Sequence, residues 1–210
     1  MKFWKMAAIG AAVVSVGAVG AYAQYRNSVD EPAYTTISED GDFQLREYDP
    51  MIVAEVTHTG DRRPALNAGF RRLAAYIFAQ DRPGKEIAMT SPVMQDQEAK
   101  IAMTSPVMQD GDNTAGSWRT RFVMPAEYTM ETLPTPPEDI TLTEVPSRKV
   151  AAIRFSGRGS TADLSNKEIE LRNWIAEQGL TPAGPEEFAF YDAPMVPPPL
   201  RRNEVIIPVE

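Results

Sequence analysis

The chain has 210 residues, of which 43% are hydrophobic and 24% charged, values typical of one globular domain with a substantial core. Its formal charge of −8 argues against nucleic acid as a partner, because a phosphate backbone requires a basic surface. The chain contains no cysteine, which excludes disulfides, thiolate metal sites and cysteine nucleophiles. A single histidine, His58, leaves most catalytic and metal-binding constellations without a second imidazole.

The first 23 residues have the pattern of a targeting segment. Two lysines precede an uncharged run over residues 6–23, which ends in the small-x-small triplet Ala21-Tyr22-Ala23. This order is typical of a cleaved signal peptide, and the run also approaches the length of a membrane anchor. In both cases we expect the domain outside the cytoplasm, in the periplasm or tethered to the inner membrane facing it, with residues 24–33 as a linker.

The next segments predict a hairpin followed by a helix. From residue 42 to residue 58, short alternating stretches are broken at Asp49-Pro50, where a turn is expected. After Gly60, apolar residues recur at spacings of four, three and four, which predicts a helix that starts near Asp61. These residues are Leu66, Phe70, Leu73 and Ile77.

The phrase IAMTSPVMQD occurs twice, from Ile87 and from Ile101, and residues 118–124 form a further strand candidate. We expect the two copies to pair as a hairpin that sets Val93 opposite Met103 and Met89 opposite Val107, because this register gives one face of Ile, Met and Val. Proline within each copy favours an edge, a bulge or a strand end. The methionines favour core packing, although thioethers also suit flat hydrophobic ligands and can bind haem iron.

The second half repeats the order of the first. Residues 140–157 predict a hairpin turned at Pro146-Ser147, and residues 160–179 predict a helix with Ser160 or Thr161 as N-cap and Gly179 as C-cap. Strands follow near residues 188–191 and 204–209. We therefore expect an α+β fold in which two similar hairpin–helix–strand halves form a twisted β-barrel or curved antiparallel sheet with two flanking helices.

Several motifs occur in an order that resembles the SOUL haem-binding family over residues 34–210. They are KIAMTSPV, W-x-x-RFVMP-x-x-Y, LP-x-P, VAAIRFSG and YDAP…LRRNEV. The resemblance implies a barrel of two similar halves, like that of the gyrase-inhibitor-like effector-binding domains. It also implies that haem or a related tetrapyrrole binds in an apolar surface groove without strong axial ligation.

In the family this groove lies beside the first helix and near the loop before the last strand. Carried over residue by residue, the resemblance implies apolar walls and cations for the propionates from the residues Leu66, Phe70, Leu73, Met195, Val196, Leu200, Arg63, Arg71 and Arg72. We expect His58 to face solvent, although its strand position could also point it inward. The first hypothesis is an exported carrier or sequestering protein for haem, with no metal ligand or catalytic residue assigned and its oligomeric state open.

A second hypothesis is an enzyme that uses Glu204 on a hydrophobic ligand. A carboxylate in an apolar cleft can have its pKa raised into the range of a general base. The structural alternative is an internal pair between Arg and Glu that holds the last strand in place. A third hypothesis is an interaction module that binds no small ligand.

Overall fold

The computed structural model describes residues 30–97, 116–193 and 195–210. The predicted targeting segment, most of the linker and the second copy of the repeated phrase lie outside the described residues. Every described helix and strand belongs to one compact unit, Glu31–Glu210. None of the described helices is long and apolar enough to span a bilayer.

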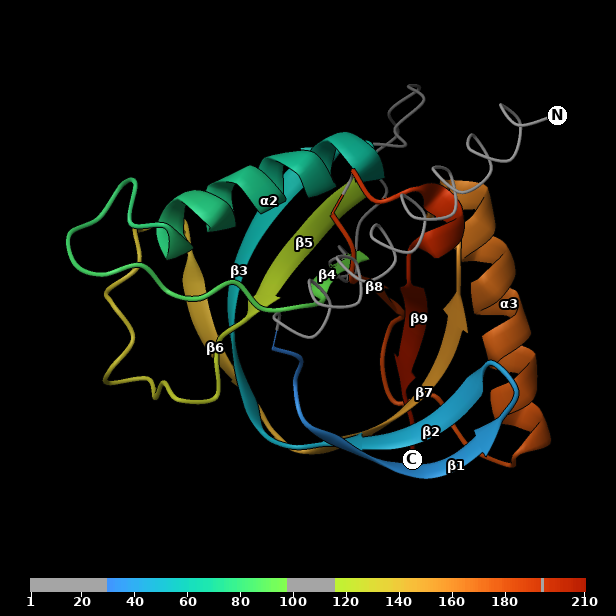
Figure 1. The fold of residues 1–210 in the computed structure, drawn as a ribbon. Helices are drawn as coiled ribbons and strands as arrows, with labels where there is room; N and C mark the ends of the chain where they lie inside the picture. The colour runs from blue at the N-terminus through green and yellow to red at the C-terminus, as the bar shows by residue number, and fades with distance from the viewer. Residues whose placement is uncertain (1–29, 98–115, 194) are drawn as a thin grey trace, which may run out of the picture. The chain divides into compact units, whose positions relative to one another are not determined.

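The described residues form two α-helices, one short 3-10 helix and nine strands (Figure 1). In chain order they are β1 (Tyr34–Asp40), β2 (Phe43–Tyr48), β3 (Met51–Gly60), α2 (Arg62–Ile77), β4 (Val93–Gln97), β5 (Gly116–Val123), β6 (Thr141–Val145), β7 (Arg148–Phe155), α3 (Thr161–Glu177), β8 (Glu187–Phe190), η1 (Pro198–Leu200) and β9 (Asn203–Pro208).

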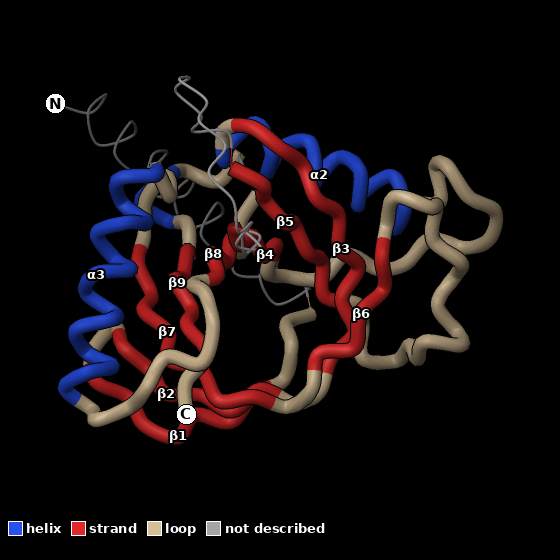
Figure 2. Tube along the Cα trace, turned by 180° about the vertical axis from the view of Figure 1, so that it is seen from behind, coloured by secondary structure: helices blue, strands red, loops and turns tan. Residues whose placement is uncertain are grey.

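All nine strands belong to one antiparallel sheet in the order β1-β2-β7-β9-β8-β4-β5-β3-β6. The sheet is strongly curved, and Figure 2 shows its two ends as separate edges. The predicted curved antiparallel sheet is therefore confirmed, whereas a closed barrel is wrong because the end strands β1 and β6 do not pair with each other.

The strand order confirms two similar halves. From the junction of β8 and β4, the order outward is β9, β7 and β2 on one side and β5, β3 and β6 on the other. Each half contributes three central strands, and the strand that precedes them in the chain, β2 or β6, pairs with a strand of the other half. Strand β1 pairs with β2 at the outer edge of the sheet. The two helices lie on the outer face of the sheet, α2 on β3 and β5 and α3 on β7 and β9 (Figure 1).

The two predicted hairpins are wrong in their pairing. Strands β2 and β3 do not pair with each other; β2 pairs with β7, and β3 pairs with β6. Tyr48 pairs with Arg148. Met51, three residues after Tyr48, pairs with Val145, three residues before Arg148. One register therefore runs through both pairs, and Asp49-Pro50 lies opposite Pro146-Ser147. Proline interrupts both ladders at the same point, so two long strands bend together instead of folding back on themselves.

The predicted pairing between the two copies of the repeated phrase fails at Val93. Strand β4 has both of its edges occupied, because Val93 pairs with Phe122 on β5 and with Phe190 on β8. Its predicted partner Met103 lies outside the described residues, as does Val107, the predicted partner of Met89. The first copy instead supplies a central strand, with Pro92 just before it, where no ladder hydrogen bond is lost.

Apolar residues divide the sheet into two faces. The outer face packs against α2 through Ala54, Val56 and Phe122, and against α3 through residues such as Ile153 and Val205. Ser160 starts α3 with a capping box, as its hydroxyl accepts from Asp163 N and the Asp163 side chain accepts from Ser160 N. The inner face carries the third core, formed by Tyr48, Val53, Met94, Val123, Val150, Ala152, Ala189 and Ile206.

Candidate functional site

One flank of helix α2 carries three of the predicted binding residues. The stripe that faces the sheet includes Gly69 and Leu73, both buried. Phe70 follows Gly69 by one residue, about 100° around the helix, and Leu66 and Arg63 precede Phe70 by four and seven residues, which places all three on its side. We call Arg63, Leu66 and Phe70 the α2 strip. Leu66 and Phe70 are half-buried, and Arg63 is exposed.

The α2 strip is apolar at its base and charged at its rim. The Phe70 ring meets the Phe122 ring edge to face, with centroids 5.4 Å apart, and packs on the same core as Val93. Arg63 makes no hydrogen bond or ion pair with any other described residue, so its guanidinium is available to an external carboxylate. An apolar surface beside a free cation can bind a flat hydrophobe that carries acid groups.

Three predicted residues of α2 lie off this surface. Leu73 has 0% exposure, so it belongs to the core and offers no surface to a ligand. Arg72 precedes Leu73 by one residue and therefore lies on the opposite flank. Its guanidinium binds both oxygens of Asp139, at 2.5 and 2.6 Å, and also contacts Asp81. Arg71 points away from the sheet and is exposed.

The loop before β9 supplies the other predicted wall. Met195 is 88% exposed and Leu200 is 51% exposed, whereas Val196 is 7% exposed and is therefore mainly a buried residue. Hydrogen bonds connect this region to the start of α2: Arg62 Nη2 donates to Gly159 O at 3.0 Å, and Gly157 N donates to Pro198 O at 2.9 Å. Figure 1 shows the loop beside the first turn of α2. The binding role of these residues stays a prediction.

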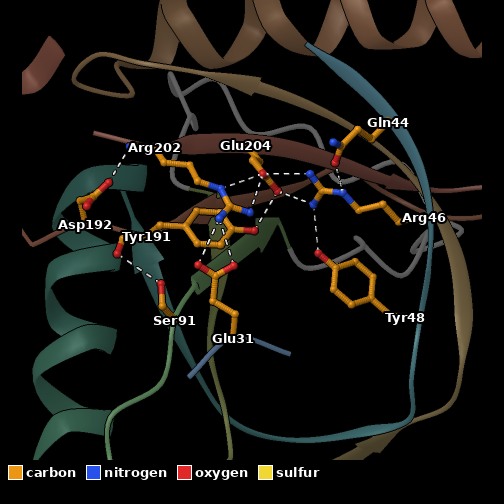
Figure 3. Close-up of polar contacts among 9 residues, drawn as sticks. All are labelled: Glu31, Gln44, Arg46, Tyr48, Ser91, Tyr191, Asp192, Arg202 and Glu204. Carbon is orange, nitrogen blue, oxygen red and sulfur yellow. Dashed lines mark hydrogen bonds and ion pairs between the residues drawn. The ribbon is translucent and has the colours of Figure 1, made fainter. Parts of the chain in front are cut away.

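Glu204 lies at the centre of a buried polar cluster on the inner face (Figure 3). Its carboxylate has 0% exposure and accepts from Arg46 at 2.7 and 3.0 Å, from Arg202 at 3.0 Å and from the Tyr191 hydroxyl at 2.8 Å. Arg202 also donates to Glu31 at 3.0 and 3.1 Å and stacks over the Tyr191 ring. Alternation in β2 puts Arg46 on the inner face, but only the fold reveals its partner 158 residues away.

The pKa of Glu204 is lowered, which does not suit a general base of ordinary strength. Burial alone would raise it, but the hydrogen bonds and charges of Arg46 and Arg202 outweigh burial. Burial beside Glu204 raises the pKa of the Tyr191 phenol. The structure thus has the predicted internal Arg and Glu pair, which Arg46 extends into a clamp that holds β9 against the interior.

A second buried group of charges occupies the same face. Glu187 accepts two hydrogen bonds from Arg148, at 2.7 and 2.8 Å, and lies 3.0 Å from Arg121. Arg121 also contacts Asp96, which is 1% exposed, at 3.1 Å. Burial would raise the pKa of Glu187, but the two arginines lower it overall. These charged side chains of the inner face are therefore buried and paired with one another, and the sequence motifs did not predict this.

Comparison with family models matches residues 29–208 to the SOUL heme-binding protein model. The chain belongs to the SOUL haem-binding family. This membership supports haem or a related tetrapyrrole as the ligand, and because the family is one of binding proteins, it favours a role other than catalysis. Comparison with curated protein sequences finds no match.

Solved structures share the fold of this SOUL domain at low sequence identity. The crystal structure of the EcmrR C-terminal domain has a TM-score of 0.58 and 13% identity, and covers 84% of this chain and 98% of that one. A hydrolase from Listeria innocua has a TM-score of 0.54 and 12% identity, with coverage of 83% and 94%. At these identities the likeness concerns the fold alone.

His58 lies away from the α2 strip of the SOUL domain. It is half-buried on β3, opposite Trp118, and its Nδ1 is buried without a hydrogen bond. The pKa of Asp139 is lowered, chiefly by the Arg72 hydrogen bonds. The described residues contain no cluster of three or more His, Asp or Glu side chains that could hold a metal ion.

Proposed function

We propose that this SOUL domain carries or sequesters haem or a related tetrapyrrole in the cell envelope and binds it on the α2 strip. Family membership over residues 29–208 is the observation that carries the proposal. A tetrapyrrole supplies a large flat apolar surface and two propionates when bound. In this chain Leu66 and Phe70 would contact the macrocycle, and Arg63 would pair with a propionate.

Two features support binding outside the sheet. On the inner face, the side chains of Asp96, Glu187 and Glu204 are at most 5% exposed and already bound to arginines, so a ligand there would have to break charged pairs. On the outer face, Arg63 has no competing partner among the described residues and Met195 is almost fully exposed. A ligand on the α2 strip therefore displaces no described ion pair.

Titration with haemin tests the proposal. The wild-type chain should give a saturable shift of the Soret band. Arg63→Glu should weaken binding severalfold, because it places a like charge beside the propionate. Arg71→Glu is the matched control: it changes the same charge on the same helix but on its solvent side, and it should bind like wild type. A featureless response of the wild type, or equal losses in both variants, would contradict the proposal.

Phe70→Asp tests the apolar part of the strip, since it places a charge where the macrocycle would lie. Phe70 also contacts Phe122, so thermal melting must show how much of any loss comes from weaker folding. Ile169→Asp on α3 is the control, because Ile169 is 58% exposed. The enzyme alternative rests on Glu204, which the two arginines already neutralise. Loss of enzymatic turnover in a Glu204→Gln variant, without loss of stability, would favour the enzyme alternative.

A further inference from the structure

The loop before β9 exposes large apolar side chains to solvent. Met195 is 88% exposed, the largest value among the exposed large hydrophobic residues described, and Leu200 is 51% exposed. Pro197 and Pro199 between them are also exposed. The six consecutive residues 195–200, which we call the Met195–Leu200 loop, carry no charged side chain, and Met195, Pro197, Pro199 and Leu200 form an exposed apolar tip.

The base of this loop is fixed. Gly157 N donates to Pro198 O at 2.9 Å, and Arg201 Nε donates to Val196 O at 2.7 Å. Leu200 N donates to Pro197 O at 2.9 Å within the short helix η1. The prolines restrict the backbone further. The exposed side chains are therefore held outward in advance, so their contact with another surface costs little conformational entropy.

The start of the domain is tied to a residue that follows this loop. Arg202 binds the Glu31 carboxylate through its side chain and Asp192 Oδ2 through its backbone N, at 2.6 Å, as Figure 3 shows. Upstream of Glu31, only residues 24–30 separate the domain from the uncharged run 6–23. Seven residues span at most about 25 Å when fully extended. A bilayer that held the uncharged run would therefore tether the start of the domain close to its surface.

A cation lies next to the apolar tip. Arg158 directly follows Gly157, whose backbone binds Pro198, and its side chain is exposed. It makes no hydrogen bond or ion pair with another described residue. Aliphatic side chains flanked by arginine are the combination that suits the lipid interface, where the apolar groups enter and the cation meets phosphates.

We propose that the Met195–Leu200 loop docks on a lipid bilayer, with Met195 and Leu200 entering the interface and Arg158 at the headgroups. The loop also borders the α2 strip, so docking would bring the proposed tetrapyrrole site to the membrane surface. Docking itself needs no tetrapyrrole, and its test is independent of haemin binding.

The absence of native cysteine makes the test direct. The full chain is prepared as Met195→Cys and, for comparison, as Ile169→Cys on α3, each labelled with a nitrobenzoxadiazole fluorophore. Both are reconstituted in vesicles of phosphatidylcholine and phosphatidylglycerol. The label at position 195 should shift its emission to the blue and be quenched by doxyl-labelled lipid, while the label at position 169 should keep the emission it has in water.

A second variant checks that the loop itself makes the contact. Leu200→Asp in the Met195→Cys background should reduce the quenching at least severalfold, because it places a charge in the apolar tip. Circular dichroism verifies that both proteins are folded. A label at position 195 that stays in water, or quenching that Leu200→Asp leaves unchanged, would overturn the proposal.

Discussion

Replacement of Glu204 by glutamine should destabilise the domain strongly. The carboxylate is fully buried and accepts four hydrogen bonds, two from Arg46, one from Arg202 and one from Tyr191. Glutamine keeps one acceptor oxygen but turns an amide donor toward the arginines and removes the negative charge. At least two charge-assisted hydrogen bonds are lost, at about 1.5–3 kcal/mol each. An uncompensated buried charge also costs about 3–5 kcal/mol, so we expect Glu204→Gln to lower the free energy of unfolding by about 3–5 kcal/mol.

The loss can be measured by urea unfolding at neutral pH, followed by tryptophan fluorescence. For a domain of this size, the expected change corresponds to a melting temperature lower by roughly 6–20 °C. Glu170→Gln is the control, because Glu170 pairs with Lys167 at 2.7 Å on the surface and its removal should cost less than about 1 kcal/mol. A loss below about 1 kcal/mol for Glu204→Gln would refute the view that this cluster holds β9 in place.

The same variant predicts a pH dependence. The folded pKa of Glu204 lies below its ordinary value, so its contribution to stability is complete above the unfolded pKa of about 4.3. This contribution is lost as the pH falls through the lowered folded pKa, because the protonated acid then resembles glutamine. The stability difference between wild type and Glu204→Gln should therefore shrink in acid, and a difference that stays constant would contradict this reasoning.

Three further changes test other parts of the fold and site. Gly69→Ala should destabilise by about 1–3 kcal/mol in urea unfolding, because its Cβ would lie 2.6 Å from the Thr120 Cβ, and a gain of stability would contradict the close packing of α2. Ser160→Ala should cost about 1 kcal/mol in the same assay through loss of the capping box; no loss would show that the cap is dispensable. Arg72→Ala should leave haemin affinity unchanged, since Arg72 lies on the other flank of α2, and weaker binding in the Soret titration would move the site.

Local sequence signals predicted the elements well where side chains alternate or recur at helical spacing. Both helices follow this rule, and Ser160 is the N-cap that the sequence offered. Strand β1 was missed because its residues are almost all exposed, so no alternation of apolar and polar residues marks it. A proline in an alternating segment is equally compatible with a tight turn and with a bend, and only the partner strand distinguishes them. Pairing between residues about 100 apart is not encoded locally.

The sequence predicted only part of the candidate site. The family resemblance pointed to α2 and the loop before β9, and it also carried Leu73, Arg71 and Arg72 over to the binding surface. These three residues lie off the α2 strip, because a turn of 100° per residue separates the buried stripe, the two flanks and the solvent side of the helix. Apart from the pair of Arg202 and Glu204, the buried charge pairs escaped prediction, because their partners lie on different strands. Glu204 and Arg46, for example, meet only when β9 and β2 flank β7.

The most direct test of the account is to locate the ligand on the protein. Ferric haemin is paramagnetic and broadens the amide NMR signals of residues close to its iron. The account predicts that haemin at stoichiometric concentration selectively broadens the amide signals of Arg63, Leu66, Phe70, Met195, Val196 and Leu200, and spares α3 and the strands around Glu204. Broadening centred on the inner face, or spread evenly over the domain, would contradict it.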